Sequence, residues 1–110
     1  MNKVFVTQEP ARKVGGRWEP TINLAPAAAW GEVRVMLRPG TSFFAREPVL
    51  ATLRDALREF GASDYLLPLG DPLIMATAAI LAYERVRPAR LRLLKWDRMM
   101  GEYVLGEVGV

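Results

Sequence analysis

The dipeptide Gly70-Asp71 is the strongest candidate for chemistry in this sequence. It follows an apolar run at 65–69 and precedes Pro72, a spacing that predicts a buried strand, a tight turn and a helix capped by Asp71. Open α/β sheets bind ligands at the carboxyl ends of central strands, where Asp71, together with Asp64, would offer a catalytic or metal-binding carboxylate. A single glycine and an acidic helix start disfavour phosphate. We therefore interpret Asp71 as a structural cap, and an enzyme or nucleotide binder centred on Gly70 and Asp71 is the third hypothesis.

Composition narrows the chemistry further. The chain has no histidine and no cysteine, which removes disulfides, thiolate metal sites, the commonest general base and the commonest metal ligand. No nucleophile constellation is visible in the pattern of the remaining residues. We expect a protein that is not an enzyme and that binds no cofactor and no metal.

Length and charge indicate one ordinary globular domain over residues 1–110, with 51% hydrophobic and 25% charged residues. The net charge of +3 is too small to indicate nucleic acid by itself. The N-terminus lacks the apolar core of a secretory signal, and the longest nearly uncharged stretch, from Pro72 to Tyr83, is too short to cross a bilayer. We expect a cytoplasmic protein with no membrane association.

Apolar periodicity and turn residues predict the elements that position these side chains. Gly15-Gly16 lies between two short strands at 11–14 and 17–19, which is typical of a two-residue hairpin turn. Helices are predicted from about 47 to 60 and from 72 to about 86, with one helical turn at 26–30. Further strands are predicted at 3–8, 32–37, 65–69, 90–96 and 103–108, the last two forming a hairpin.

This order predicts an α/β fold. We expect a five- or six-stranded mixed sheet with two helices packed on one face, and β-hairpins at the N-terminal and C-terminal ends. Crossovers between parallel strands are right-handed, so two crossovers that step in the same direction put both helices on one face. Alternation at 32–37 and 90–93 leaves a charged side on each strand. The second face is expected to be partly open, with Arg34, Arg90 and Arg92 on it.

The predicted helix at 72–86 is apolar on every side, since only Thr77 is polar between Pro72 and Tyr83. A helix packed on a sheet needs one apolar stripe. In one interpretation, the outer side of this helix is only weakly apolar because alanines occupy it, and the first helix covers another of its sides. In the other, the helix contacts a second copy or a partner protein, because exposed apolar patches mark such sites. The predicted outward-facing protein interface consists of Met75, Ala78, Ala79 and Ala82.

A basic run from Arg85 to Arg98 supports an alternative. It contains five arginines and one lysine against a single acid, with one tryptophan, and such residues can hold a nucleic-acid backbone and stack a base. The plainer interpretation is the solvated side of an alternating strand. The residues of a nucleic-acid-binding sheet face would be Arg85, Arg87, Arg90, Arg92, Lys95 and Trp96. The hairpin at 11–19 is a second basic projection, with Arg12, Lys13 and Arg17 at its tip.

Four segments together resemble a known group of proteins. They are 4–10, 18–20 with 23–27, 64–72, and Leu94-Lys95-Trp96-Asp97. The set resembles small proteins of similar length that bacteriophages and other mobile elements of bacteria encode, and the similarity covers nearly the whole chain. The resemblance implies an accessory protein that acts inside a bacterial cell, and it transfers no activity and no site residue.

Two hypotheses of different classes follow for function. The leading one is a small non-enzymatic accessory protein of a phage or mobile element that acts by protein–protein binding, to a second copy of itself as a homodimer or to a host factor. The alternative is a nucleic-acid-binding protein that uses the basic sheet face.

Overall fold

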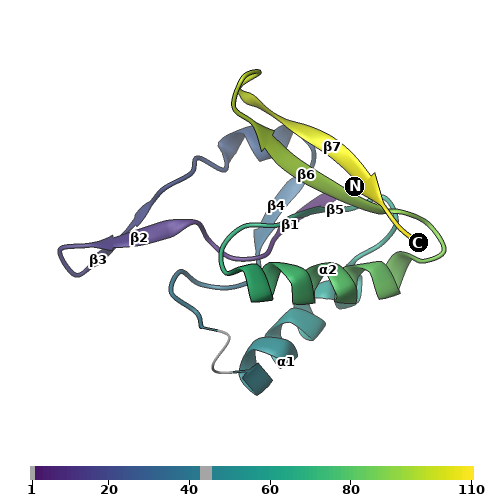
Figure 1. Cartoon of the computed structure of the whole chain (residues 1–110), viewed down its shortest axis with the longest axis horizontal. Coiled ribbons are helices and arrows are strands. Elements are labelled where there is room, and N and C mark those ends of the chain that lie inside the picture. Colours follow the sequence, from purple (N-terminus) through teal and green to yellow (C-terminus); the bar gives the residue numbers. More distant parts are fainter. Residues whose placement is uncertain (1, 43–45) are drawn as a thin grey trace.

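A five-stranded mixed sheet forms the centre of the molecule (Figure 1). The computed structural model describes residues 2–42 and 46–110. The strand order is β4-β1-β5-β6-β7, and only the β6–β7 pair is antiparallel within this sheet. The strands are β1 (Lys3–Val6), β4 (Glu32–Val35), β5 (Tyr65–Leu67), β6 (Leu91–Asp97) and β7 (Glu102–Val108). The predicted α/β class and mixed sheet are confirmed.

Both helices lie on one face of this sheet, as predicted (Figure 1). They are α1 (Arg46–Ala56), which continues into the short 3-10 helix η2 (Leu57–Glu59), and α2 (Pro72–Val86). The chain steps from β4 to β5 and from β5 to β6 in the same direction, so right-handed crossovers place both helices on the same side. The core between helices and sheet includes Phe5, Leu53, Leu66, Ile74 and Leu91.

The second face is partly covered, and Arg92 lies on it at intermediate exposure, so the predicted partly open face holds in part, but the covering segment was not predicted. The chain steps from β1 to β4 in the opposite direction, which carries the connection to the other side of the sheet. That connection contains the 3-10 helix η1 (Ala25–Ala29), the helical turn that the sequence predicted. Ala27 of η1 is fully buried in a second apolar cluster with Val4, Val6, Tyr65, Leu67, Leu94 and Tyr103.

Arg34 lies on the helix side of the sheet and not on the second face, which corrects one part of that prediction. It is in register with Phe5, and side chains in register on neighbouring strands share a face. Because β4 is an edge strand, the guanidinium reaches solvent and donates to Glu32 at 2.6 Å and to Glu59 at 2.8 Å. These hydrogen bonds, that to Glu32 most strongly, raise the pKa of Arg34 above its ordinary value.

The N-terminal hairpin stands apart from the main sheet. Strands β2 (Ala11–Val14) and β3 (Arg17–Pro20) form a separate antiparallel pair that extends away from the body (Figure 1). Gly15 and Gly16 have φ values of 56° and 78°, the positive angles that a tight two-residue hairpin turn requires. The predicted N-terminal and C-terminal hairpins are both confirmed.

Candidate protein-binding surface

The switch point of the sheet lies between β1 and β5. The chain leaves β1 toward β4 and leaves β5 toward β6, in opposite directions, so a crevice opens beyond the carboxyl ends of these two strands. A pocket of about 520 Å³ lies there, between the root of the β2–β3 hairpin and Gly70-Asp71. This is the position at which the sequence predicted a ligand site as one hypothesis.

Gln8 joins the loops of this crevice by structural hydrogen bonds. Its Nε2 donates to the carbonyl oxygens of Arg38 and Thr41, at 3.2 and 2.9 Å. Its Oε1 accepts the Asp71 N–H at 2.9 Å. The side chain is buried, and these bonds use both of its N–H donors. Gln8 therefore holds the loops after β1, β4 and β5 together.

Gly70 and Asp71 also serve the fold. Gly70 has a φ of 96°, and a Cβ atom there would lie 2.6 Å from the Cβ of Gln8, so only glycine fits. The Asp71 carboxylate accepts the Leu73 N–H at 2.8 Å as the N-cap of α2, which confirms the structural interpretation. The Thr7 hydroxyl also exchanges hydrogen bonds with the backbone of the loop after β5. Sequence reasoning missed Gln8 and Thr7 because neither belongs to a recognisable spacing.

Asp64, the second candidate carboxylate, is structural as well. It is buried, its Oδ1 accepts the Lys3 N–H at 2.9 Å, and its Oδ2 accepts the Gly61 N–H at 2.8 Å. Within the described residues, no three acidic side chains come together as a metal site would require. The two carboxylates that the sequence singled out are thus used to fix loops.

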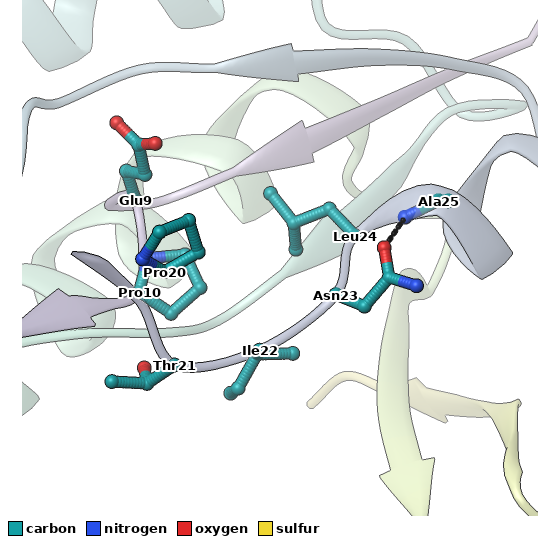
Figure 2. A pocket seen from close by; sticks show the side chains of 8 residues that line it. All are labelled: Glu9, Pro10, Pro20, Thr21, Ile22, Asn23, Leu24 and Ala25. Atoms are coloured by element: carbon teal, nitrogen blue, oxygen red, sulfur yellow. Dashed lines mark hydrogen bonds between the residues drawn. The ribbon is translucent and has the colours of Figure 1, made fainter.

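A second pocket lies on the other side of the hairpin root, with a volume of about 550 Å³ (Figure 2). Pro10 and Pro20 form its wall. The Glu9 side chain carries the carboxylate of this pocket, and it points away from the side-chain amide of Asn23 (Figure 2). The Asn23 Oδ1 already accepts the Ala25 N–H at 3.0 Å. Polar groups do not converge here, so the pocket lacks the arrangement of a small-molecule site.

The six predicted nucleic-acid-binding residues do not share one face. Alternation along β6 puts Arg92 and Trp96 on the second face and Lys95 on the helix face. The Arg92 guanidinium lies 4.1 Å from the centre of the Tyr65 ring and donates to the Ser63 carbonyl oxygen at 3.1 Å.

The other members of that set are equally dispersed. Trp96 packs edge-on against Tyr103, with ring centres 4.9 Å apart, and Arg85 at the end of α2 donates to the Arg58 carbonyl oxygen at 2.6 Å. Arg87 and Arg90 are exposed beyond α2. The Tyr103 hydroxyl is buried without a hydrogen-bond partner among the described residues, and this burial raises its pKa. The continuous basic sheet face that the alternative requires is therefore absent from the described residues.

Helix α2 presents the bulky Leu73 and Ile80 outward and buries two of the alanines that were predicted to face outward. Ala78 and Ala82 are 0% exposed, so their predicted outward orientation is wrong. Met75 and Ala79 are half-buried. Leu73 and Ile80, seven residues apart and so on one side of the helix, are 59% and 62% exposed. Small residues face the sheet because they let the helix approach it closely. The inward row consists of Ile74, Ala78, Ala82 and Val86.

An apolar groove of about 410 Å³ lies between the second half of α2 and the end of β7. Helix α2 packs against β6 and leaves the helix side of the edge strand β7 uncovered. The Tyr83 hydroxyl accepts the Val110 N–H at 3.2 Å, which ties the chain after β7 to the helix. The apolar lining residues are Ala79, Ile80, Tyr83, Leu91, Val108 and Val110.

The rim of this groove carries one acid and one base. Glu84 and Arg87 both line it, both are exposed, and neither forms a salt bridge among the described residues. Among the described strands, the adjoining strand β7 pairs with β6 alone. We refer to α2, the groove and β7 together as the α2–β7 surface.

Comparison with known proteins identifies a family. A family model described as phage Pam3 gp32-like protein matches residues 2–110. Neither a curated protein nor a solved structure matches the chain. In the described part of the chain, neither helix combines the length and apolar character needed to cross a bilayer. The similarity to small phage proteins that the sequence suggested is confirmed.

Proposed function

The chain belongs to the phage Pam3 gp32-like protein family, and from this premise we propose that it is a non-enzymatic phage protein that acts by protein–protein binding in the cytoplasm of the host bacterium. The contact is the α2–β7 surface, and its occupant is a second copy of the chain. The observation that carries the proposal is the apolar groove beside an unpaired edge strand.

The groove is lined by apolar side chains that the chain itself leaves partly exposed. Ile80 and Val108 are 62% and 46% exposed although they flank buried Leu91. Exposed apolar groups of this size beside a free strand edge mark interaction sites. An edge strand also offers unpaired backbone N–H and C=O groups to another strand. A protein partner satisfies both needs at once, since it supplies apolar cover and backbone hydrogen bonds.

A second copy fits this surface because the surface complements itself. Two β7 strands related by a two-fold axis near Val108 pair antiparallel and join the two sheets into one, with both α2 helices on the same face. Glu84 of one copy then faces Arg87 of the other across the axis. A side chain added at Gly106 would meet no atom within 4 Å, which leaves room for an apolar side chain of the second copy.

The spacing of such a dimer is consistent with its side chains. In such a dimer the two β7 strands lie between the two β6 strands. The β6 strands are then three strand spacings of about 4.8 Å apart, which is about 14 Å. Because each α2 packs on its own β6, the two α2 helices are separated by a similar distance. That distance exceeds the roughly 8–10 Å between the axes of directly packed helices, so side chains bridge the two helices. Ile80, Tyr83 and Val110 lie in that gap, and the long side chains of Glu84 and Arg87 span it.

The absence of catalysis in this proposal has its own support. The chain has no histidine or cysteine, and the Gln8 and Asp71 side chains at the switch point are occupied in holding loops and capping α2. A catalytic general acid or base needs a positioned group that is available to the substrate. Activity against any substrate that is lost in Asp71→Asn, with the helix intact, would overturn this part.

Light scattering on the purified protein tests the dimer. We expect twice the chain mass of 12.3 kDa at micromolar concentration. The variant Val108→Lys puts like charges beside the two-fold axis and is expected to weaken dimerisation by about thirtyfold or more, which corresponds to about 2 kcal/mol. Val35→Lys on β4 is the matched control, because Val35 and Val108 are 43% and 46% exposed. A single-chain mass for the wild type at every concentration, or an equal loss in both variants, would refute the second copy as occupant.

A further inference from the structure

The β2–β3 hairpin is a basic arm that the proposed dimer does not use. All of its strand residues except Ala11 are exposed, and the arm pairs with no strand of the main sheet (Figure 1). A Cβ atom at Gly15 or Gly16 would meet nothing within 4 Å, so the turn stands free in solvent. The arm therefore projects into the surroundings with its turn unattached.

Contacts at the root set the direction of the arm. The Thr21 N–H donates to the Pro10 carbonyl oxygen at 2.9 Å, and the Glu9 N–H donates to the Leu37 carbonyl oxygen at 3.0 Å. The Trp18 indole lies against Gly40, where a Cβ atom would be 2.5 Å from Cζ2. An isolated two-stranded ribbon is marginally stable in water, so this bracing is what keeps the arm in place.

The free part of the arm carries three cations on two faces. Residues directly opposite in an antiparallel pair share a face, so Lys13 lies with Trp18, and Arg17 lies with Val14 on the other side. Arg12 lies on the same side of the hairpin as Arg17. It is directly opposite Glu19, the one acidic residue of the two strands. None of the three cations forms a salt bridge within residues 2–42 and 46–110. The Lys13 ammonium lies 5.8 Å from the centre of the Trp18 ring.

We propose that this arm binds duplex DNA by inserting into the major groove, with Arg12, Lys13 and Arg17 contacting the phosphates on both sides. A flat acidic surface would meet only one face of the ribbon, whereas a groove with a phosphate row on each side meets both. The major groove of B-form DNA, about 12 Å wide, admits a two-stranded β-ribbon. The deep, narrow major groove of A-form RNA excludes it. Because all three cations contact phosphates in this arrangement, the binding is independent of sequence.

Salt dependence measures the phosphate contacts. Three contacts predict a slope of log K against log salt of about −2.7, so raising monovalent salt from about 50 to about 200 mM weakens binding about fortyfold. Fluorescence anisotropy with a labelled duplex of mixed sequence is the measurement. A duplex RNA of the same length is expected to bind at least tenfold more weakly.

Variants locate the binding on the arm. The triple variant Arg12→Gln, Lys13→Gln and Arg17→Gln is expected to lose nearly all binding, with its melting temperature unchanged because the arm is outside the core. The control replaces the exposed Arg54, Lys95 and Arg98 by glutamine, which removes the same charge away from both the arm and the apolar groove. The control is expected to bind within about threefold of the wild type. Equal loss in both variants, absence of binding by the wild type, or equal binding to duplex RNA would overturn the proposal. Tighter binding to poly-L-glutamate than to DNA would also overturn it, in favour of an acidic protein.

Discussion

The two edges of the main sheet differ in length and in charge. Strand β4 has four residues, and its Arg34 side chain bridges Glu32 and Glu59 along the edge. Strand β7 has seven residues, of sequence EYVLGEV, with no lysine, arginine or proline. Natural sheets blunt their edges with short strands, charges and prolines. The β4 edge is protected in this way. The β7 strand is longer, and its two charged residues, Glu102 and Glu107, form no salt bridge among the described residues, so we propose its edge as the one that pairs.

Exposed apolar area alone would not have distinguished these edges. Val35 on β4 and Val108 on β7 are almost equally exposed, at 43% and 46%. The difference lies in what surrounds them, because β7 adjoins an apolar groove beside α2, while the ionic cluster of Arg34 lies along β4. The proposal of β7 as the binding edge therefore rests on its unpaired backbone together with the groove beside it.

The largest expected effect tests which side of α2 is buried against the sheet. Ala78→Leu adds bulk to a fully buried position and is expected to lower the free energy of unfolding by about 1–3 kcal/mol. Ala76→Leu makes the same change at an exposed position of the same helix and is expected to alter it by less than about 0.5 kcal/mol. Urea unfolding at one protein concentration measures both. Similar losses in the two variants would mean that the orientation of α2 is different.

An intermediate effect tests the charges at the rim of the groove. Glu84→Arg or Arg87→Glu alone places like charges across the two-fold axis and is expected to weaken dimerisation about tenfold, which corresponds to about 1.4 kcal/mol over two symmetric contacts. The double variant with both changes restores the opposite pairs and is expected to return to within about twofold of the wild type. Sedimentation velocity at several concentrations gives the dissociation constants. If the double variant is weaker than both single variants, Glu84 and Arg87 do not face each other in the dimer.

The smallest expected effect is the pH dependence of the protected edge. The hydrogen bond from Arg34 lowers the pKa of Glu59 below its ordinary value. A carboxylate with a lowered folded-state pKa contributes stability above its unfolded-state pKa, and this contribution disappears as the pH falls through the folded-state value. Glu59→Gln should therefore be slightly less stable than the wild type near neutral pH and equally stable in acid. Because both side chains are exposed, the difference is small. Urea unfolding of both proteins across acidic pH measures it, and a difference that stays constant with pH would contradict the ion pair.

Local signals in the sequence predicted most of the elements. Gly15-Gly16 between two short strands gave the hairpin, Asp71 with Pro72 gave the start of α2, and alternation gave β6 and β7. Each signal depends on residues within a few positions of one another. The predicted helix at about 47–60 corresponds to α1 followed by η2, since one apolar stripe runs through both.

The parts that the sequence could not predict depend on contacts between distant segments. Helix α2 is apolar all round, so its periodicity carries no information on which side is buried, and the alanines were assigned to the wrong side. The covering of the second face by η1 follows from the position of β4 beside β1, which no local pattern encodes. Alternation in β4 divides its residues into two sets, but only the register with Phe5 shows which set faces the helices. The α2–β7 surface depends on the orientation of α2 and on its position beside β6 and β7, and therefore required the structure.

Hydrogen–deuterium exchange at low and high protein concentration tests the contrast between the edges most directly. If β7 pairs with a second copy, amide exchange in Glu102–Val108 slows as the concentration rises, while exchange in Glu32–Val35 does not change. The same exchange rate in β7 at both concentrations, with a single-chain mass in each sample, would contradict the account.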